Sequence, residues 1–417
     1  MNFKKKRMSD KNGAMPKILV TDSHRGSAIA IIRSLGRKGY RVVAADSNPR
    51  SLGFQSRYAR EKVVYPNPES QPQEFCDFIL DTVQKQGIDL VLPVTDLVIQ
   101  PLASRREDFS GKTKLAIPEN ELLQAVTDKD QTVQIAQKLG VPTPATFTVR
   151  TAAEALAKAK ELGWPVVLKP QISRLLRQGE RIEKYSVSYA NDAEDLQRQM
   201  SELEGKCSVL LQRYLEGIGY GVELLMHEGR PLAAFEHKRL REVPLTGGPS
   251  AYRESVRLHP ELYQYSVRIL KELRWTGLAM VEFKVGNERA ELMEINGRVW
   301  GSLPLAIASG VDFPAMLVEL YLNGADAVKP QLNSEYKIGL KCRDLGRDLM
   351  WMVSVLIRRQ KVSFLPMPNR VQALSAFLSL FDPRNKFDLL CFDDPRPGLA
   401  ELPRIYQKFR VKRQQLS

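Results

Sequence analysis

The chain has 417 residues, of which 43% are hydrophobic and 26% are charged. These proportions are ordinary for a globular protein and exclude a wholly disordered chain. The longest strictly apolar run in the C-terminal part, Leu349 to Val353, is far shorter than the roughly 20 residues that a membrane-spanning helix needs. Because the length exceeds the usual span of one hydrophobic core, we expect two or three domains and no transmembrane helix.

The net charge of +14 is concentrated at the two ends of the chain. Residues 1–17 carry six basic side chains against one acidic one, and residues 331–417 carry sixteen against eight, so the long middle part is nearly neutral. Basic ends can touch nucleic acid or an anionic membrane, but solvated tails are commoner. Since no nucleic-acid-binding motif accompanies them, we expect no specific nucleic-acid partner, while peripheral contact with an anionic membrane stays open.

The first residues hold a basic cluster without the apolar segment of a secretory signal. The four cysteines lack the C-x-x-C spacing of zinc sites and do not suggest a disulfide framework. We therefore expect a cytoplasmic protein, with peripheral attachment to a membrane as the alternative.

Helices and strands alternate between residues 15 and 118. The segments KILVTD and YRVVAAD are typical of buried strands on either side of the helix SAIAIIRSLGRKG, and the pattern repeats with EFCDFILDTVQKQG and IDLVLPVTD. Such alternation predicts a parallel sheet with helices on its faces. Asp46 at the end of the second strand would suit a dinucleotide site, but the turn TDSHRGS has one glycine where that fingerprint has three. We therefore do not expect nicotinamide binding.

A small α+β unit follows. Residues 119–140 predict a helix with a break near Thr127, ended by the segment GVPTP. Further helices are predicted at residues 151–163 and 192–205, alternating with the strands WPVVLKP and CSVLLQRYLEG. Residues 220–240 then predict a hairpin that turns at Glu228 and Gly229.

The stretch VEFKVGNERAELMEINGRVWG, residues 281–301, predicts a second hairpin with its turn at residues 287–289. In this register Glu282 lies opposite Glu294, and the odd-numbered positions form an apolar face. The flanking pairs on that apolar face are Val281 with Ile295 and Phe283 with Met293.

Two opposed carboxylates are destabilising unless a cation lies between them. Asn296 is expected on the same face as Glu282 and Glu294, and three oxygen ligands of this kind suit Mg²⁺. The alternative is a solvated face on which Lys284 helps to neutralise the pair.

Several ordered segments resemble those of the ATP-grasp superfamily, over roughly residues 15–325. DKDQTVQIAQKLGVPTP is similar to the segment that enters the grasp fold, WPVVLKP and AFEHKRL to phosphate-contacting strands, LLQRYLEG to the hinge on which adenine lies, and VEFKV with LMEINGR to the metal strands. The resemblance implies three groups of site residues. These are nucleotide contacts at Lys129, Lys169, Gln212, Arg213, Tyr214, Leu215 and Lys238, Mg²⁺ ligands at Glu282, Glu294 and Asn296, and a catalytic arginine at Arg298.

The implied fold class is α/β, with an N-terminal parallel-sheet (pre-ATP-grasp) domain, a two-lobed α+β ATP-grasp fold and a C-terminal helical extension. We expect ATP to lie between the lid and the larger lobe that carries the metal site. In residue numbers the expected parts are a basic flexible tail at 1–14, a Rossmann-like domain at 15–118, the ATP-grasp domain at 119–330 with its lid at about 145–212, and a basic extension at 331–417.

Two segments depart from the superfamily pattern. After Lys169 many members have a glycine-rich loop, whereas PQISRLLRQGERIEKYSV has one glycine and several arginines. Phosphate contact there would come from Arg174 or Arg177. The acid that commonly holds the ribose is also missing from EGIGYGVE, where Glu223 is the candidate substitute.

The resemblance implies a carbamoyl-phosphate-synthetase-like ligase that uses ATP and Mg²⁺, with Mn²⁺ as a substitute, to activate a carboxylate as an acylphosphate and join it to an amine. The substrates would be a small-molecule or peptide carboxylate and an amine, and a homo-oligomer is compatible with the sequence. Two alternatives stay open: a carboxylase-type half-reaction with bicarbonate, and a nucleotide-binding regulatory protein without turnover.

The segment RLREVPLTGGPSAYRESV predicts a long polar loop, and substrates often bind to such loops. Its candidates for binding the accepting carboxylate are Arg241, Ser250 and Arg253, with a solvated connection as the equally supported alternative. No general base stands out, because structural histidines are the more usual interpretation of His237 and His259.

Beyond about residue 330 the resemblance ends. RDLMWMVSVLIRRQKV and RVQALSAFLSLFDPRNKF have helical spacing, with large apolar residues on one side and arginines near the ends. Resting on an anionic membrane is one interpretation, and docking against the body of the protein is the simpler one.

Overall fold

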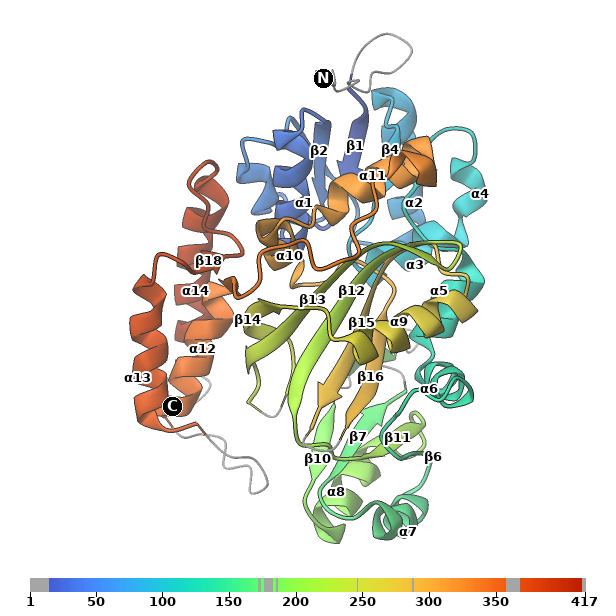
Figure 1. Cartoon of the computed structure of the whole chain (residues 1–417), viewed down its shortest axis with the longest axis vertical. Helices are drawn as coiled ribbons and strands as arrows, with labels where there is room; N and C mark the ends of the chain where they lie inside the picture. The colour runs from blue at the N-terminus through green and yellow to red at the C-terminus, as the bar shows by residue number, and fades with distance from the viewer. Residues whose placement is uncertain are drawn as a thin grey trace.

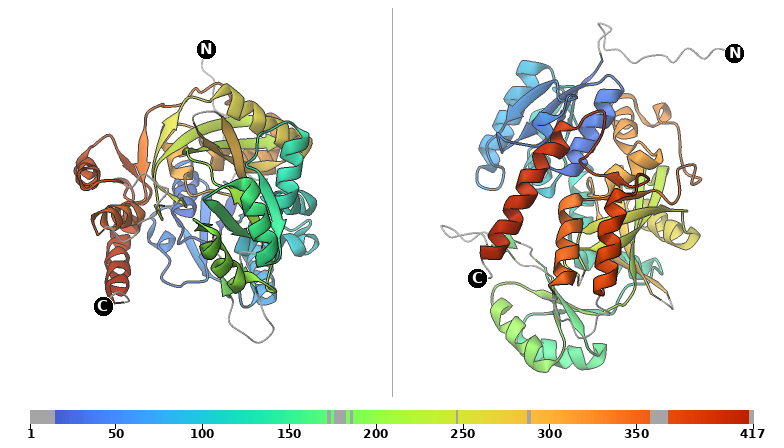
Figure 2. Two further views of the ribbon diagram at one scale, coloured as in Figure 1. Left: turned by 90° about the horizontal axis from the view of Figure 1, so that it is seen from below. Right: turned by 90° about the vertical axis from the view of Figure 1, so that its left-hand side faces the viewer.

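The computed structural model describes residues 15–171, 187–245, 247–286, 289–357 and 368–414, together with 174–175 and 183–184; at these last four residues, and at 408 and 410–414, only the backbone is described. An N-terminal sheet stands at one end, a large sheet lies in the middle, and a small lid sheet stands at the other end (Figure 1). The C-terminal helices lie along one flank of the molecule (Figure 2).

The N-terminal part is a five-stranded sheet in the order β3-β2-β1-β4-β5, and each of its pairs is parallel, which confirms the predicted parallel sheet. Its central strand is apolar and buried on both faces, as parallel sheets require. The elements are β1 (Lys17–Val20), α1 (Gly26–Arg37), β2 (Arg41–Asp46), β3 (Glu61–Val64), α2 (Pro72–Gln86), β4 (Leu90–Leu92), α3 (Asp96–Ser104), α4 (Arg106–Phe109) and β5 (Lys114–Leu115).

Asp46, which ends β2, is engaged by neighbouring groups of the protein. Its Oδ2 accepts hydrogen bonds from the backbone N–H of His24 at 2.7 Å and from the Ser51 hydroxyl at 2.9 Å, and it lies 2.9 Å from the His24 ring. In a dinucleotide site, an acid at this position would bind the ribose. Here the Asp46 carboxylate instead stabilises the loop after β1.

The lid is a four-stranded sheet in the order β10-β7-β11-β6, covered by two helices that pack on each other. Before it, the helix predicted from residue 119 breaks at Asp128, close to the predicted Thr127, because Asp128 caps the second helix. The elements are α5 (Asn120–Thr127), α6 (Lys129–Lys138), β6 (Thr146–Val149), α7 (Ala152–Leu162), β7 (Val166–Pro170), β10 (Ser188–Ala190), α8 (Ala193–Leu203) and β11 (Val209–Arg213), with β8 (Arg174–Leu175) and β9 (Glu183–Lys184) paired separately.

The central sheet has seven strands in the order β16-β15-β12-β13-β14-β17-β18. One of its faces packs against α9, and the other shares a core with α1, α10, α11 and the N-terminal sheet. The predicted turn at Glu228 and Gly229 is confirmed, and both residues have positive φ. The elements are β12 (Ile218–His227), β13 (Arg230–Glu242), β14 (Ser250–Val256), α9 (Pro260–Glu272), β15 (Gly277–Val285), β16 (Ala290–Asn296), α10 (Leu303–Ser309), α11 (Phe313–Asn323), β17 (Lys341–Arg343) and β18 (Lys386–Phe387).

The C-terminal extension docks on the body of the protein, as the simpler of the two interpretations predicts. It supplies the last two strands of the central sheet, because β17 pairs with β14 and β18 pairs with β17. Its helices are α12 (Leu345–Leu356), α13 (Arg370–Leu378) with the short helix η3 (Ser379–Phe381), and α14 (Arg396–Gln414).

Aspartates of the extension pair with arginines of the body. Asp394 accepts from Arg33 of α1 at 2.9 Å, and both side chains are buried. Asp388 accepts from Arg253 of β14, which is 1% exposed. Since a buried charge is tolerated only with a partner, these pairs fix the extension to both the N-terminal and central sheets.

No single helix among the described residues has the length and the apolar composition to cross a bilayer. The bent helix pair α10 and α11 has this length and apolar composition when its two helices are counted together. The apolar residues of this pair belong to the core shared by the two sheets.

Replacing Asp388 with alanine should leave the buried Arg253 guanidinium without a counter-charge. We expect this change to lower the free energy of unfolding by about 3–5 kcal/mol, measured as a shift of the urea midpoint followed by circular dichroism. The matched control is Asp382→Ala, which removes the partner of the exposed Arg384 and should leave the midpoint nearly unchanged. A wild-type midpoint for Asp388→Ala would show that the pair does not hold the extension in place.

Candidate functional site

The two glutamates of the predicted hairpin face each other. Glu282 on β15 pairs with Glu294 on β16. One pairing was wrong: Phe283 lies opposite Leu292, not Met293, because a β-bulge shifts the register after Glu282. Bulges of this kind re-aim side chains beside active sites.

An amide bridges the two carboxylates, and a guanidinium contacts one of them. The Nδ2 of Asn296 donates to Oε1 of Glu282 and to Oε1 of Glu294, each at 3.0 Å. Arg239 of β13 donates to Oε2 of Glu282, and its Nη1 donates to Oε1 of Glu242 at 2.9 Å. A positive charge beside the opposed carboxylates is therefore supplied by an arginine that the sequence analysis did not single out.

Two glycines of β12 make room for this arrangement. A Cβ at Gly219 would lie 2.9 Å from Cδ of Arg239, and a Cβ at Gly221 would lie 2.4 Å from Cε1 of His237. The alternating glycines of GIGYG were therefore the available signal that large side chains of the neighbouring strand cross β12 here.

The two carboxyl groups are held in different electrostatic states. Burial raises the pKa of Glu282, and the nearby Glu294 adds to this rise, although Arg239 opposes it. Burial also acts to raise the pKa of Glu294, but the Asn296 amide, Lys169 and Arg239 together outweigh it and lower that pKa. Glu294 is therefore the carboxylate that stays ionised.

Two of the predicted lysines lie close enough to this pair to act on it. Burial lowers the pKa of Lys169 on β7 to about 8, Glu294 opposes the shift, and Lys129 at the start of α6 adds to it. Among the described residues neither Lys169 nor Lys129 forms a salt bridge. These half-buried ammonium groups therefore offer positive charge without a carboxylate partner.

Lys238 is not brought to the same place. On β12, Gly221 pairs with Glu282, whereas its neighbour Tyr220 pairs with Lys238. Because successive residues of a strand point to opposite faces, Lys238 lies on the other face of the sheet. There its Nζ pairs with Oε2 of Glu254 at 3.0 Å.

The predicted hinge lies where β11 leaves the lid for the central sheet. Gln212 donates to the Thr146 hydroxyl at 2.9 Å, and its buried Oε1 has no hydrogen-bond partner among the described residues. Arg213 pairs with Glu291 of β16 at 2.6 Å. Next to them, the Tyr214 ring lies under Nζ of Lys284, 4.9 Å from the ring centroid, and Leu215 is half-buried.

Arg298 reaches across to the N-terminal domain. Its Nε donates to Oδ2 of Asp96 at 2.7 Å, and its Nη1 donates to the carbonyl of Val299 at 3.1 Å. Asp96 begins α3, directly after the strand β4. The sequence analysis did not single out Asp96, although its place after the strand in IDLVLPVTD marks it as a residue at the carboxyl edge of the sheet.

The predicted substrate loop is not a loop. Most of its residues belong to β13 and β14. Arg241 pairs with Asp348 of α12 at 2.7 Å, Arg253 pairs with Asp388, and the Ser250 hydroxyl donates to the carbonyl of Tyr252 at 3.2 Å. Both predicted arginines are thus used to dock the extension, and the structure does not gather the three residues as an open carboxylate site.

The histidines and Glu223 have structural partners. His237 is fully buried, and its Nδ1 lies 3.0 Å from Oε1 of Glu223, which also accepts from the Ser302 hydroxyl at 2.7 Å. Burial lowers the pKa of His237, although Glu223 opposes the shift. His259 precedes α9, and its backbone N–H donates to Glu236 at 2.8 Å. Glu223 is therefore occupied inside the sheet and was wrong as the ribose-holding substitute.

Arg177 and the side chain of Arg174 lie outside the described residues. Across the described part of the chain, no three His, Cys, Asp or Glu side chains are grouped as a ready metal site. The donor set at β15 and β16 is instead two carboxylates and one amide, and turning the Asn296 amide over would present its oxygen. Such a set fits Mg²⁺, which takes one or two carboxylates and completes its shell with phosphate oxygens and water.

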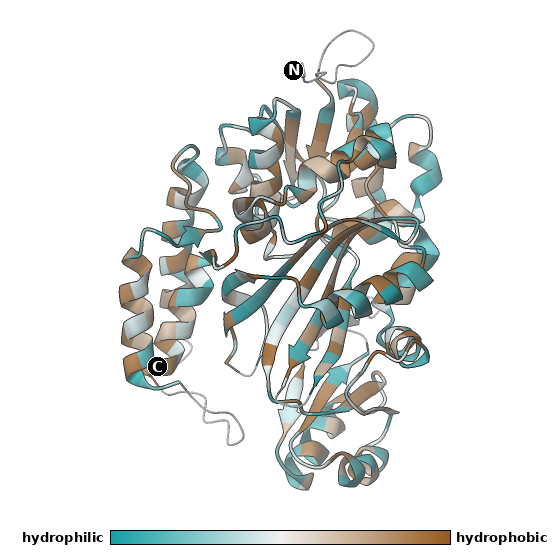
Figure 3. Cartoon of the chain, in the orientation of Figure 1, coloured by the Kyte–Doolittle hydropathy of each residue, from teal (hydrophilic) through white to brown (hydrophobic). Residues whose placement is uncertain are grey.

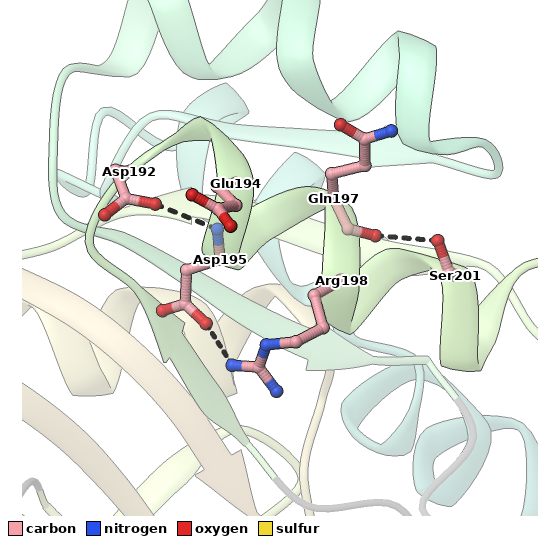
Figure 4. A pocket seen from close by; sticks show the side chains of 6 residues that line it. All are labelled: Asp192, Glu194, Asp195, Gln197, Arg198 and Ser201. Atoms are coloured by element: carbon pink, nitrogen blue, oxygen red, sulfur yellow. Dashed lines mark hydrogen bonds and ion pairs between the residues drawn. The ribbon is translucent and has the colours of Figure 1, made fainter.

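A hollow on the outer surface of the lid contains none of the predicted site residues. It is lined along α8 by polar side chains that bond to one another, as Figure 4 shows for Asp195 with Arg198. Asp192 in the same hollow accepts from the backbone N–H of Asp195 and so caps the helix. The carboxylates there are engaged in holding the helix, and the candidate site remains the face of β15 and β16.

Comparison with known proteins gives a family match over part of the chain. Residues 206–340, which include β15 and β16, match the family described as "ATP-grasp in the biosynthetic pathway with Ter operon". The carbamoyl phosphate synthase large chain of Xylella fastidiosa is 28% identical over 204 residues, covering 46% of this chain. The chain spans only 18% of the length of that relative.

Two solved structures share the fold. An L-amino acid ligase from Bacillus licheniformis has a TM-score of 0.57 at 14% identity, covering 76% of this chain and 78% of its own. The biotin carboxylase domain of a Hydrogenobacter thermophilus 2-oxoglutarate carboxylase, solved with MgADP, ADP and bicarbonate, has a TM-score of 0.57 at 18% identity, covering 76% and 73%. The family match over residues 206–340, the parallel N-terminal sheet, the lid and the facing strands β15 and β16 together support the resemblance to the ATP-grasp superfamily.

Proposed function

We propose that this chain is an ATP- and Mg²⁺-dependent ligase that activates a carboxylate as an acylphosphate and joins it to an amine. The observation that carries the proposal is the pair Glu282 and Glu294, held face to face with Asn296 and approached by Lys169 and Lys129, which have no salt-bridge partner among the described residues. Acidic ligands for a cation and free ammonium groups for an anion thus meet at one place, as a metal–nucleotide complex demands.

The reaction brings a carboxylate to the γ-phosphate of ATP, and both groups are anions. One such pair of charges at 4 Å repels by about 4 kcal/mol at an effective dielectric of 20. Mg²⁺ bound to the nucleotide would offset this repulsion and align the phosphate oxygens. Glu282, Glu294 and Asn296 would hold it, and Mn²⁺ should replace it, since both take oxygen ligands.

The chain's own residues would do the positioning. Lys169 and Lys129 would bind nucleotide phosphates as point charges, and the hinge Gln212 would meet the base with its unpaired Oε1. Arg298 would bind the substrate carboxylate through its planar fork. Because Nε of Arg298 is held by Asp96, the Nη2 end of the fork is left for that substrate.

Exchanging Glu294 for glutamine should abolish turnover, because the carboxylate that stays ionised is lost. We expect ADP release with pooled carboxylates and amines to fall at least about 100-fold. The control is Glu254→Gln on the opposite face of the sheet, which should keep its activity. Undiminished ADP release by Glu294→Gln in a responsive pool would refute the mechanism, and release with bicarbonate alone would assign a carboxylase-type half-reaction instead.

ATP affinity in the absence of Mg²⁺ should fall as the pH rises above 8. The pKa of Lys169 is lowered to about 8 by burial, so the free protein loses this ammonium charge there, while bound phosphate favours the charged form. The dissociation constant measured by calorimetry should rise by up to about tenfold per pH unit. Lys169→Arg keeps its charge and should flatten the profile; an equal slope in both proteins would mean that Lys169 does not contact the nucleotide.

Arg298→Lys should weaken binding of the carboxylate substrate and leave ATP binding unchanged. The substitution keeps the charge but loses the fork, so we expect kcat/KM for the carboxylate to fall by about tenfold or more and the ATP dissociation constant to stay the same. Asp96→Asn, which loosens the fork, should raise KM for the carboxylate in the same direction. A loss confined to ATP binding would place Arg298 on the nucleotide.

A further inference from the structure

The helix α13 and its continuation η3 turn their large apolar side chains toward solvent. The residues that face the protein are small, since Ala373 and Ala376 are 1% and 3% exposed. The opposite side forms a stripe, here named the apolar face, in which each side chain is between 47% and 74% exposed. Its members are Val371, Leu374, Phe377, Leu378 and Phe381.

This order reverses the usual pattern of a helix on a protein surface, which buries its large apolar residues. The five positions follow helical spacing, so they lie along one side of α13. Phe377 and Phe381 also contact each other edge to face, with ring centroids 5.8 Å apart. The stripe is therefore continuous, and the helix α13 that carries it lies on the flank of the molecule, away from β15 and β16 (Figure 1 and Figure 3).

Charged side chains of the extension are sorted between its two sides. Three aspartates point inward and pair with buried or nearly buried arginines: Asp348 with Arg241 and Arg343, Asp388 with Arg253, and Asp394 with Arg33. Along residues 370–386, which contain the apolar face, the exposed basic side chains are Arg370, Arg384 and Lys386, while the acid is Asp382, already paired with Arg384. The outward side of the extension thus combines apolar and basic groups.

We propose that the apolar face docks on an anionic lipid bilayer. Large apolar side chains with basic residues beside them are what an interfacial helix presents to acyl chains and phosphate headgroups. A second copy of the chain would bring the same basic flanks together, so the charges oppose self-association. This inference stands on the extension alone and is independent of the proposed ligase activity.

The test is flotation of the full chain with vesicles of phosphatidylcholine, with and without phosphatidylglycerol. We expect the protein to float with the anionic vesicles only, and to be released as salt rises. The double variant Leu374→Glu with Phe377→Glu should bind at least about tenfold more weakly, because it loses two apolar side chains that would enter the bilayer. Its unfolding midpoint should match the wild type's, since both positions are exposed.

The control is Val64→Glu, which places one such negative charge at an exposed apolar residue of the N-terminal sheet and should leave flotation unchanged. Equal loss in this control, or binding of the double variant as tight as the wild type's, would overturn the proposal. So would failure to float with any vesicle. A wild-type dimer in light scattering that the double variant converts to a monomer, without vesicle binding, would assign the apolar face to a second copy.

Discussion

Two carboxylates held face to face are the constraint on which the candidate site depends. Opposed like charges push adjacent strands apart, yet Glu282 and Glu294 occupy the same rung of β15 and β16. Three features offset the repulsion: the Asn296 amide bonds to both, Arg239 contacts Glu282, and the apolar residues behind the strands pack against α9. Arg239 fits only because β12 has glycine at 219. The motif therefore extends over four strands, and the hairpin alone does not explain it.

The extension completes the support of this site from the other side. Arg253 on β14 pairs in register with Arg239 on β13, so two arginines stand on neighbouring strands. Asp388 neutralises Arg253, and Glu282 and Glu242 neutralise Arg239. Without the extension, β14 would present an unpaired buried guanidinium next to the residue that holds Glu282. The C-terminal residues, which sequence resemblance does not reach, are thus part of the electrostatic framework around β15 and β16.

Sequence was sufficient where local patterns decide the structure. Period-two alternation placed Glu282 opposite Glu294, and helix–strand alternation predicted the parallel sheet. It failed where the outcome depends on contacts distant along the chain. The bulge that displaced Met293, the partners of Arg241 and Arg253 about a hundred residues away, and the bond from Arg298 to Asp96 leave no mark at those positions themselves. The local sequence around an arginine in a polar segment does not reveal whether its partner is a substrate or a buried aspartate.

Basic residues with a structural role differ from candidate ligand-binding residues in whether a carboxylate of the protein already pairs with their charge. Arg213, Arg239, Arg241, Arg253 and Arg298 each have a carboxylate partner, and most of them join elements that lie far apart in sequence. Lys169 and Lys129, among the described residues, have none, although burial lowers the pKa of Lys169 and so disfavours its charge. A half-buried ammonium without a partner is costly for the fold alone. This cost is offset when an anion binds. The two lysines are therefore stronger indicators of a bound anion, such as a nucleotide, than the arginines, which already have carboxylate partners.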